Sequence, residues 1–163
     1  MTYELIPLFP LASFLILGIF GHWIKDKAHF VAVPAVVLSW CISILAFADV
    51  ADGHHSTFRM YTWLTSGMLD VHIGVTIDRL TAVMLLLVTT VSALVHVYTI
   101  GYMQGEPGYA RFFSYIALFT FSMLMLVLAD NFLQLFVFWE AVGLCSYLLI
   151  GHWYDRPSAC AAA

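Results

Sequence analysis

Residues 112–153 have the sequence FFSYIALFTFSMLMLVLADNFLQLFVFWEAVGLCSYLLIGHW, a largely apolar run with the polar pair Asp130-Asn131 near its middle. As one helix, at about 1.5 Å per residue, it would be about 63 Å long, about twice the roughly 30 Å of a bilayer's hydrocarbon core. Asp and Asn are typical turn residues. The run is therefore predicted to fold back on itself as two membrane spans, at residues 112–129 and 132–153.

Three more stretches have the length and composition of membrane spans, each of which needs about 20 mostly apolar residues. They lie at about residues 5–24, 30–48 and 77–100. Between the second and third of these, residues 49–76 are more polar, and their latter part alternates apolar with polar side chains, which indicates a short hairpin on the membrane surface. The predicted fold is all-α, a polytopic membrane protein of about five transmembrane helices with a short extramembrane hairpin-like segment.

The composition supports this fold class and excludes several others. Of the 163 residues, 63% are apolar and 10% are charged, whereas soluble domains average about 45–50% and about 25%. Six Lys and Arg against ten Asp and Glu give a net charge of −4, without the basic stripe of a nucleic-acid-binding protein. Three widely separated cysteines do not supply the four local thiolates of an iron–sulfur cluster. We expect no redox centre and no metal site on this chain.

The basic residues predict how the chain is oriented, because short cytoplasmic loops are enriched in Lys and Arg. Two of them, Arg59 and Arg79, fall on one side of the predicted spans. The other four fall on the opposite side: Lys25, Lys27, Arg111 and Arg156. The side with four is predicted to be cytoplasmic, and the N-terminus is predicted to lie outside the cytoplasm.

Glu140 is the most informative single residue. It lies about eight residues into the last span, or about 12 Å along the helix axis, near the middle of the bilayer. An unpaired carboxylate at this depth costs several kcal/mol, so the side chain must be protonated or must have a partner. Phe136, Gly143 and Tyr147 share its helix face. A proton-carrying acid inside a helix bundle is favoured over a protonated Glu that makes only an interhelical hydrogen bond. The basic residues closest to the membrane lie at span ends, too shallow to meet Glu140: Lys25, Lys27, Arg79, Arg111 and Arg156. A charged Glu140 therefore needs a counter-charge from outside residues 1–163.

A polar stripe in the third span is the second candidate. Thr89, Ser92, His96 and Thr99 lie on one helix face. Imidazole titrates near neutral pH, so hydroxyl groups and a histidine in a row can relay protons. The same groups can instead hold helices together by hydrogen bonds. Both roles stay open from the sequence.

Asp78 and Arg79 lie at the mouth of the third span. Two structural roles fit them: an ion pair at the membrane interface, or a carboxylate favoured at a helix start by the helix dipole. We expect structural anchoring.

Three stretches of the chain closely resemble the subunit L family of proton-translocating NADH:quinone oxidoreductase, respiratory complex I. They are IDRLTAVMLLLVTTVSALVHVYTIGYM at 77–103, RFFSYIALFTFSMLMLVLADN at 111–131 and FWEAVGLCSYLLIGHWY at 138–154. The resemblance implies a much longer antiporter-like subunit, of which residues 1–163 are the N-terminal membrane fragment. Glu140 matches the glutamate of that family's proton half-channel, and no position matches the lysine that the family places on a later broken helix.

The resemblance implies a function for the longer protein. It would be a membrane-arm subunit of NADH:quinone oxidoreductase, taking part in proton translocation coupled to electron transfer from NADH to quinone. It implies that NADH, FMN, iron–sulfur clusters and quinone bind other subunits, that the partners are other membrane-arm subunits and the lipid bilayer, and that the location is the bacterial inner membrane. Two alternatives are a subunit of a multi-subunit monovalent cation/proton antiporter, and an inactive truncated remnant.

Overall fold

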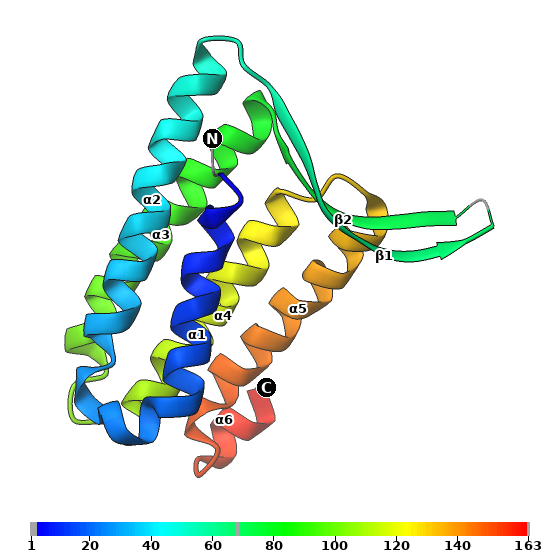
Figure 1. Ribbon diagram of the computed structural model, residues 1–163. Helices are drawn as coiled ribbons and strands as arrows, with labels where there is room; N and C mark the ends of the chain where they lie inside the picture. Colours follow the sequence, from blue (N-terminus) through cyan, green and yellow to red (C-terminus); the bar gives the residue numbers. More distant parts are fainter. Residues whose placement is uncertain (1–2, 68, 163) are drawn as a thin grey trace.

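The computed structural model describes residues 3–67 and 69–162, which form a bundle of long helices with one β-hairpin at its end (Figure 1). In this described part, five helices are long and apolar enough to cross a membrane. They are α1 (Leu5–Ile24), α2 (His29–Ala51), α3 (Arg79–Tyr102), α4 (Tyr109–Val127) and α5 (Phe132–Ile150). The shorter elements are the 3-10 turns η1 (Lys25–Lys27) and η2 (Gly151–Trp153), the strands β1 (Ser56–Ser66) and β2 (Leu69–Ile77), and the terminal helix α6 (Pro157–Ala162). The predicted fold class is confirmed.

The five helices lie close to the predicted spans, and their ends have local causes. The turn at Asp130-Asn131 separates α4 from α5, and Asn131 caps α5 by accepting a hydrogen bond from the backbone N–H of Gln134 at 2.9 Å. Helix α3 begins at Arg79 rather than at residue 77, because β2 continues to Ile77. The 3-10 turn η2 extends the last span to Trp153.

Helix α4 lies inside the bundle and has neighbours on several sides. It packs against α1, α3 and α5, while α2 packs against α1 and α3. The interior contains two apolar clusters. One, at the hairpin end, includes Ile6, Leu85, Leu124 and Leu128, and the other, at the opposite end, includes Phe113.

The segment between α2 and α3 is an antiparallel hairpin, as its alternating pattern predicts. The strands pair from Ser56 with Ile77 to Ser66 with Leu69, with register shifts near Arg59 and Thr62. Such irregularities bend a strand pair, and Figure 1 shows the hairpin crossing the end of the bundle and then projecting past α5. Val75 and Ile77 near its base are buried in the apolar cluster at this end, so the base of the hairpin is part of the fold and its tip projects away.

Candidate functional site

Helix α5 carries Glu140 on its outward face. The Glu140 side chain is exposed, and its predicted face neighbours Phe136 and Tyr147 are 57% and 56% exposed. Among residues 3–67 and 69–162, Glu140 has no hydrogen bond or ion pair. The structure therefore places the mid-span carboxylate on a surface that the five described spans leave uncovered.

Gly143 makes that surface easy for another helix to approach. A Cβ atom added at Gly143 would have no heavy atom within 4 Å in the described structure. Small residues on a transmembrane helix let a second helix backbone come close. One turn from Glu140, the α5 surface thus has a gap where a neighbouring helix can pack near the carboxylate.

The polar stripe of α3 lies in a different place, in the contact between α3 and α4. Thr89, His96 and Thr99 are buried, and Ser92 is half-buried. The hydroxyl groups of Thr89 and Thr99 each donate to a carbonyl of the preceding helical turn, at 2.7 Å in both cases. These two residues therefore satisfy their own hydrogen bonds within α3.

Ser92 and His96 form the part of the stripe that reaches another helix. The Ser92 Oγ lies 2.6 Å from the Oγ1 of Thr120 on α4. The Nδ1 of His96 lies 2.8 Å from the carbonyl oxygen of Ser92, and the same ring nitrogen lies 3.3 Å from the Ser92 Oγ. The Nε2 of His96 is buried without a hydrogen-bond partner in the described part of the chain. A buried ring nitrogen of this kind is available to a water molecule or another polar group.

Asp78 acts as the N-cap of α3. Its Oδ1 accepts a hydrogen bond from the backbone N–H of Thr81 at 2.8 Å. This bond lowers the pKa of Asp78, because it favours the charged carboxylate. Between the described residues, no ion pair joins Asp78 to Arg79. Of the two roles left open by the sequence, the geometry of Asp78 is that of the helix-start carboxylate.

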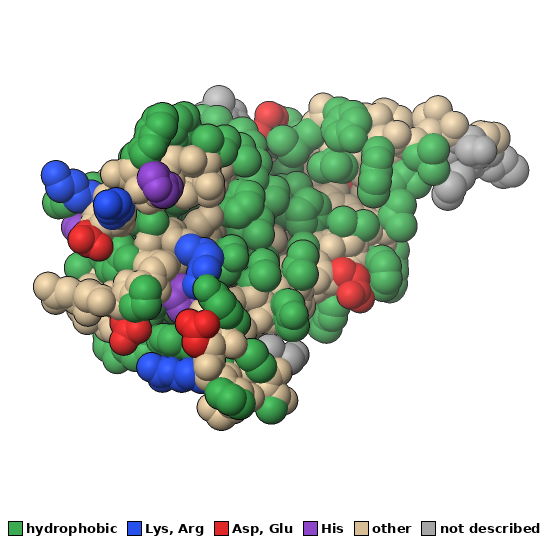
Figure 2. All heavy atoms as spheres, turned by 90° about the horizontal axis from the view of Figure 1, so that it is seen from below, with side chains coloured by type: hydrophobic (Ala, Val, Ile, Leu, Met, Phe, Trp, Pro, Cys, Tyr) green, Lys and Arg blue, Asp and Glu red, His purple; other side chains and the backbone are tan. Residues whose placement is uncertain are grey.

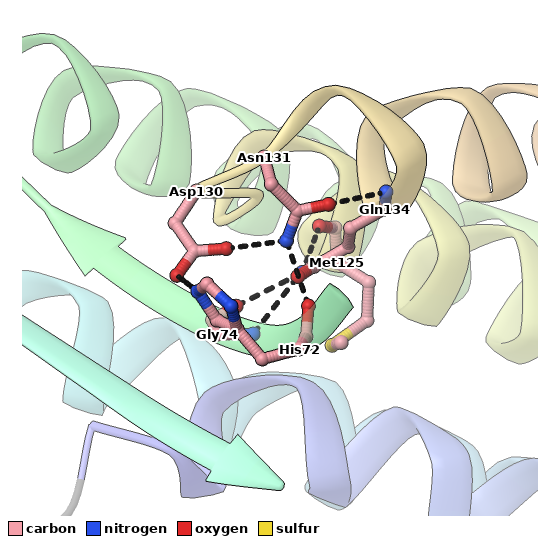
Figure 3. Close-up of polar contacts among 6 residues, drawn as sticks. All are labelled: His72, Gly74, Met125, Asp130, Asn131 and Gln134. Carbon is pink, nitrogen blue, oxygen red and sulfur yellow. Dashed lines mark hydrogen bonds and ion pairs between the residues drawn. The ribbon is translucent and has the colours of Figure 1, made fainter. Parts of the chain in front are cut away.

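A polar cluster that the sequence reasoning missed joins the hairpin to the start of α5 (Figure 3). The Nε2 of His72 on β2 lies 2.9 Å from the Oδ2 of Asp130. The Asn131 side chain donates to the carbonyl of His72 at 2.7 Å and to Asp130 Oδ1 at 2.7 Å. The buried Gln134 amide makes two 2.9 Å bonds to the backbone of Gly74, one to its N–H and one to its carbonyl. Asp130 therefore helps to hold the hairpin against the start of α5, in addition to its place in the turn.

One signal for this cluster was present in the sequence. Gln134 is a neutral amide near the start of a largely apolar span, where a polar side chain needs a partner. Its partner is the backbone of β2 at Gly74. A Cβ atom at Gly74 would collide with the Asp130 carboxylate, so the cluster needs glycine at this position. No sequence pattern pointed to the partner, which is 60 residues away in the chain.

Among the described residues, no group of three His, Cys, Asp or Glu side chains is placed to hold a metal ion.

Two family models match the chain. One, described as NADH-Ubiquinone oxidoreductase (complex I), chain 5 N-terminus, matches residues 63–113. The other, described as NADH:quinone oxidoreductase/Mrp antiporter, TM, matches residues 129–163, which include Glu140. NADH-quinone oxidoreductase subunit L of Neisseria meningitidis serogroup B is 53% identical over 161 residues, covering 96% of this chain. The chain belongs to the subunit L family.

Other relatives are named either subunit L or chain 5 of the same kind of oxidoreductase. Subunit L of Rickettsia conorii is 46% identical over 98% of this chain, and NADH-ubiquinone oxidoreductase chain 5 of Metridium senile is 42% identical over 99% of it. The chain spans about a quarter of the length of these curated relatives, 24% for both bacterial proteins and 27% for the Metridium protein.

A solved structure shares the fold. A chain of the membrane-bound sulfane sulfur reductase, an archaeal respiratory membrane complex, superposes with a TM-score of 0.84 over 98% of this chain and 32% of that chain. The sequence identity is 20%, so this likeness is evidence for the arrangement of the helices alone.

Proposed function

We propose that the chain is the N-terminal part of a membrane-arm subunit of NADH:quinone oxidoreductase, and that the longer protein takes part in proton translocation coupled to electron transfer from NADH to quinone. The family and the five apolar helices support the assignment to a membrane arm. The observation that carries the translocation role is Glu140, a carboxylate at mid-span on a helix face that the described residues leave open.

Glu140 is the proton site of this proposal. A carboxyl group in the hydrocarbon region is stable only when it is protonated or pairs with a positive charge. Its open helix face, with Gly143 beside it, admits a helix that carries water or a basic side chain. The acid can then bind a proton when the neighbouring positive charge is distant and release it when that charge approaches.

Ser92, His96 and Thr120 are proposed as a second polar path, between α3 and α4. The Nε2 of His96, which has no hydrogen-bond partner among the described residues, gives this path an open end, and Ser92 connects it to Thr120. Thr89 and Thr99 line the same helix face, but among residues 3–67 and 69–162 their hydroxyl groups bond only within α3, so their part in a relay is the weaker one.

The redox chemistry belongs to other chains in this proposal. NADH, FMN, iron–sulfur clusters and quinone bind elsewhere in the complex, and this chain contributes to the translocase part of the enzyme. Other membrane-arm subunits and the lipid bilayer are its partners. We place it in a bacterial inner membrane with its N-terminus outside the cytoplasm, because the end of the bundle that carries Lys25, Lys27, Arg111 and Arg156 is the more basic one.

The test is Glu140→Gln in the full-length subunit, assembled in its complex and reconstituted in vesicles. Gln keeps the size of the side chain and removes the exchangeable proton. We expect the number of protons pumped per NADH oxidised to fall sharply, because the side chain can no longer bind and release a proton at mid-span. Proton uptake is measured with a pH-sensitive dye, and NADH oxidation is measured by absorbance.

Two further variants make this result specific. Asp155→Asn removes an exposed carboxylate beyond α5 and should leave the pumping ratio unchanged. Glu140→Asp keeps a carboxyl group and should retain part of the pumping. A wild-type ratio in Glu140→Gln would refute the role of Glu140.

The cation/proton antiporter alternative is tested in the same vesicles. One of the two family models covers both oxidoreductase and Mrp antiporter proteins, whereas the curated relatives above are all named as oxidoreductase subunits. A sodium gradient that drives proton movement without NADH and quinone would favour the antiporter function. Proton movement only during NADH oxidation would favour the oxidoreductase function.

A further inference from the structure

A second polar site lies at the end of the bundle opposite the hairpin, away from Glu140. Here α1, α4 and the loop between α3 and α4 surround an open groove of about 760 Å³. Figure 2 looks onto this end, where Lys, Arg, Asp and Glu side chains gather among apolar ones. Helix α1 ends and helix α4 begins at this level, so the groove opens where the headgroups of a bilayer lie.

The inner part of the groove is mainly apolar. It follows α1 from Phe14 to Gly21, a length of about 11 Å at the rise of an α-helix. Gly18 and Gly21 let α1 lie close to α4 at the floor of the groove, because a Cβ atom at Gly21 would lie 3.3 Å from the Cβ of Ala110, and one at Gly18 would lie 3.8 Å from the Ser114 Oγ. This apolar strip suits an acyl chain that lies along α1.

The rim of the groove carries charges of both signs. Lys25 and Arg111 supply two cations, and Asp26 and Glu106 supply two carboxylates. Contacts with the end of α5 hold part of the rim in place: Arg111 Nη2 donates to the carbonyl of His152 at 3.3 Å, and Glu106 accepts from the indole N–H of Trp153 at 3.4 Å. A simple anion would match the two cations, but it would also bring negative charge close to the two carboxylates.

We propose that this groove binds a phospholipid whose headgroup carries both a phosphate and a primary ammonium group. The phosphate lies against Lys25 and Arg111, since basic side chains between transmembrane helices are typical phosphate ligands in membranes. The ammonium group donates hydrogen bonds to Asp26 and Glu106, which a quaternary ammonium lacks the protons to do. One acyl chain lies along the apolar strip of α1. The inference is independent of the role proposed for Glu140.

The test uses the full-length subunit in its complex, reconstituted with photoactivatable phospholipids that carry a diazirine in one acyl chain. Phosphatidylethanolamine, phosphatidylglycerol and phosphatidylcholine probes are compared, and mass spectrometry maps the labelled residues. We expect phosphatidylethanolamine to label residues 14–25 and 106–115 about tenfold more than either other probe, the effect of one charge-assisted hydrogen bond. Equal labelling of these segments by the three probes would overturn the proposal, and so would the absence of lipid labelling there.

The charge pattern is tested by variants that leave the helices intact. Asp26→Asn with Glu106→Gln should abolish the preference for phosphatidylethanolamine over phosphatidylglycerol, because only the two cations remain. Lys25→Gln should weaken labelling by both probes. The matched controls are Asp155→Asn and Lys27→Gln, which change exposed charges at the same end but outside the groove, and both should label as wild type. Unchanged labelling in the double variant would contradict the assignment of the carboxylates.

Discussion

Helices α4 and α5 are consecutive, have the same mean hydropathy and are equally able to cross a membrane, yet their surroundings differ. Half of the most apolar segment of α4 is buried inside the bundle, compared with 11% of that of α5. Among the described residues of α5, only Gln134 and Cys145 are buried. Hydropathy measures how well a segment fits a bilayer, and it does not distinguish a lipid neighbour from a protein neighbour.

The two helices have different roles in the bundle. Helix α4 organises the bundle, because α1, α3 and α5 all pack on it. Helix α5 is held by α4 on one side and by the hairpin cluster at its start, and it presents Glu140 on the opposite side. In our account, stability depends on α4 and proton chemistry depends on the outer face of α5.

The largest difference between the two helices is expected from a pair of Phe→Ala variants. Phe113 on α4 is fully buried, whereas Phe136 on α5 is 57% exposed. Phe113→Ala leaves a cavity between helices and should lower the free energy of unfolding by about 3 kcal/mol. Phe136→Ala should lower the free energy of unfolding of the same chain by well under half of that amount. Unfolding in mixed detergent micelles, followed by circular dichroism, measures both values. Equal losses would contradict the claim that α4 contributes more packing to the bundle than the outer face of α5.

A smaller effect is expected at the turn that joins α4 to α5. Gly74→Ala would place a Cβ atom in collision with the Asp130 carboxylate, so the carboxylate must move and its contact with His72 is lost. We expect a loss of about 1–2 kcal/mol, the typical cost of a disrupted buried polar contact. Faster hydrogen exchange at the backbone N–H of residue 74, which bonds to Gln134 in the wild type, reports that the hairpin has separated from α5. Exchange as slow as in the wild type would show that the cluster tolerates the change.

The smallest effect is expected at the caps of the helices and depends on pH. Asp78→Ala removes the cap of α3 and should cost about 1 kcal/mol. The pKa of Asp78 is below its usual range in the folded protein, so its contribution is present above the unfolded pKa and is lost as the pH falls through the folded pKa. The cap of α5 is the amide of Asn131, which does not titrate. The loss of unfolding free energy caused by Asp78→Ala should therefore vanish in acid, whereas the loss caused by Asn131→Ala should persist. Losses that change equally with pH in the two variants would contradict the capping role of Asp78.

The membrane spans and the hairpin were predictable because they depend on local patterns. Apolar length predicted the five helices, Asp130-Asn131 predicted the turn between α4 and α5, and the alternation in residues 49–76 predicted the strands. The helix face shared by Glu140, Phe136 and Tyr147 followed from the helical repeat.

The contacts between distant segments were not predictable from the same patterns. The bonds of Gln134 to Gly74 and of His72 to Asp130 join residues 60 and 58 positions apart, and no local periodicity encodes such a distance. The stripe on α3 was recognised, but its hydrogen-bond partner on α4, Thr120, depends on how the two helices pack. The mixed-charge groove likewise depends on packing, because it combines residues from α1 and from the loop before α4.

The central claim is that Glu140 faces a proton-conducting interior in the longer protein. The most direct measurement is an electron cryomicroscopy structure of the full-length subunit in its complex, in a lipid nanodisc, at a resolution that shows ordered water. Our account predicts a helix from beyond residue 163 against the outer face of α5, with a basic side chain or a water chain in reach of the Glu140 carboxyl group. Acyl chains packed against that carboxyl group, with neither water nor a basic side chain nearby, would contradict it.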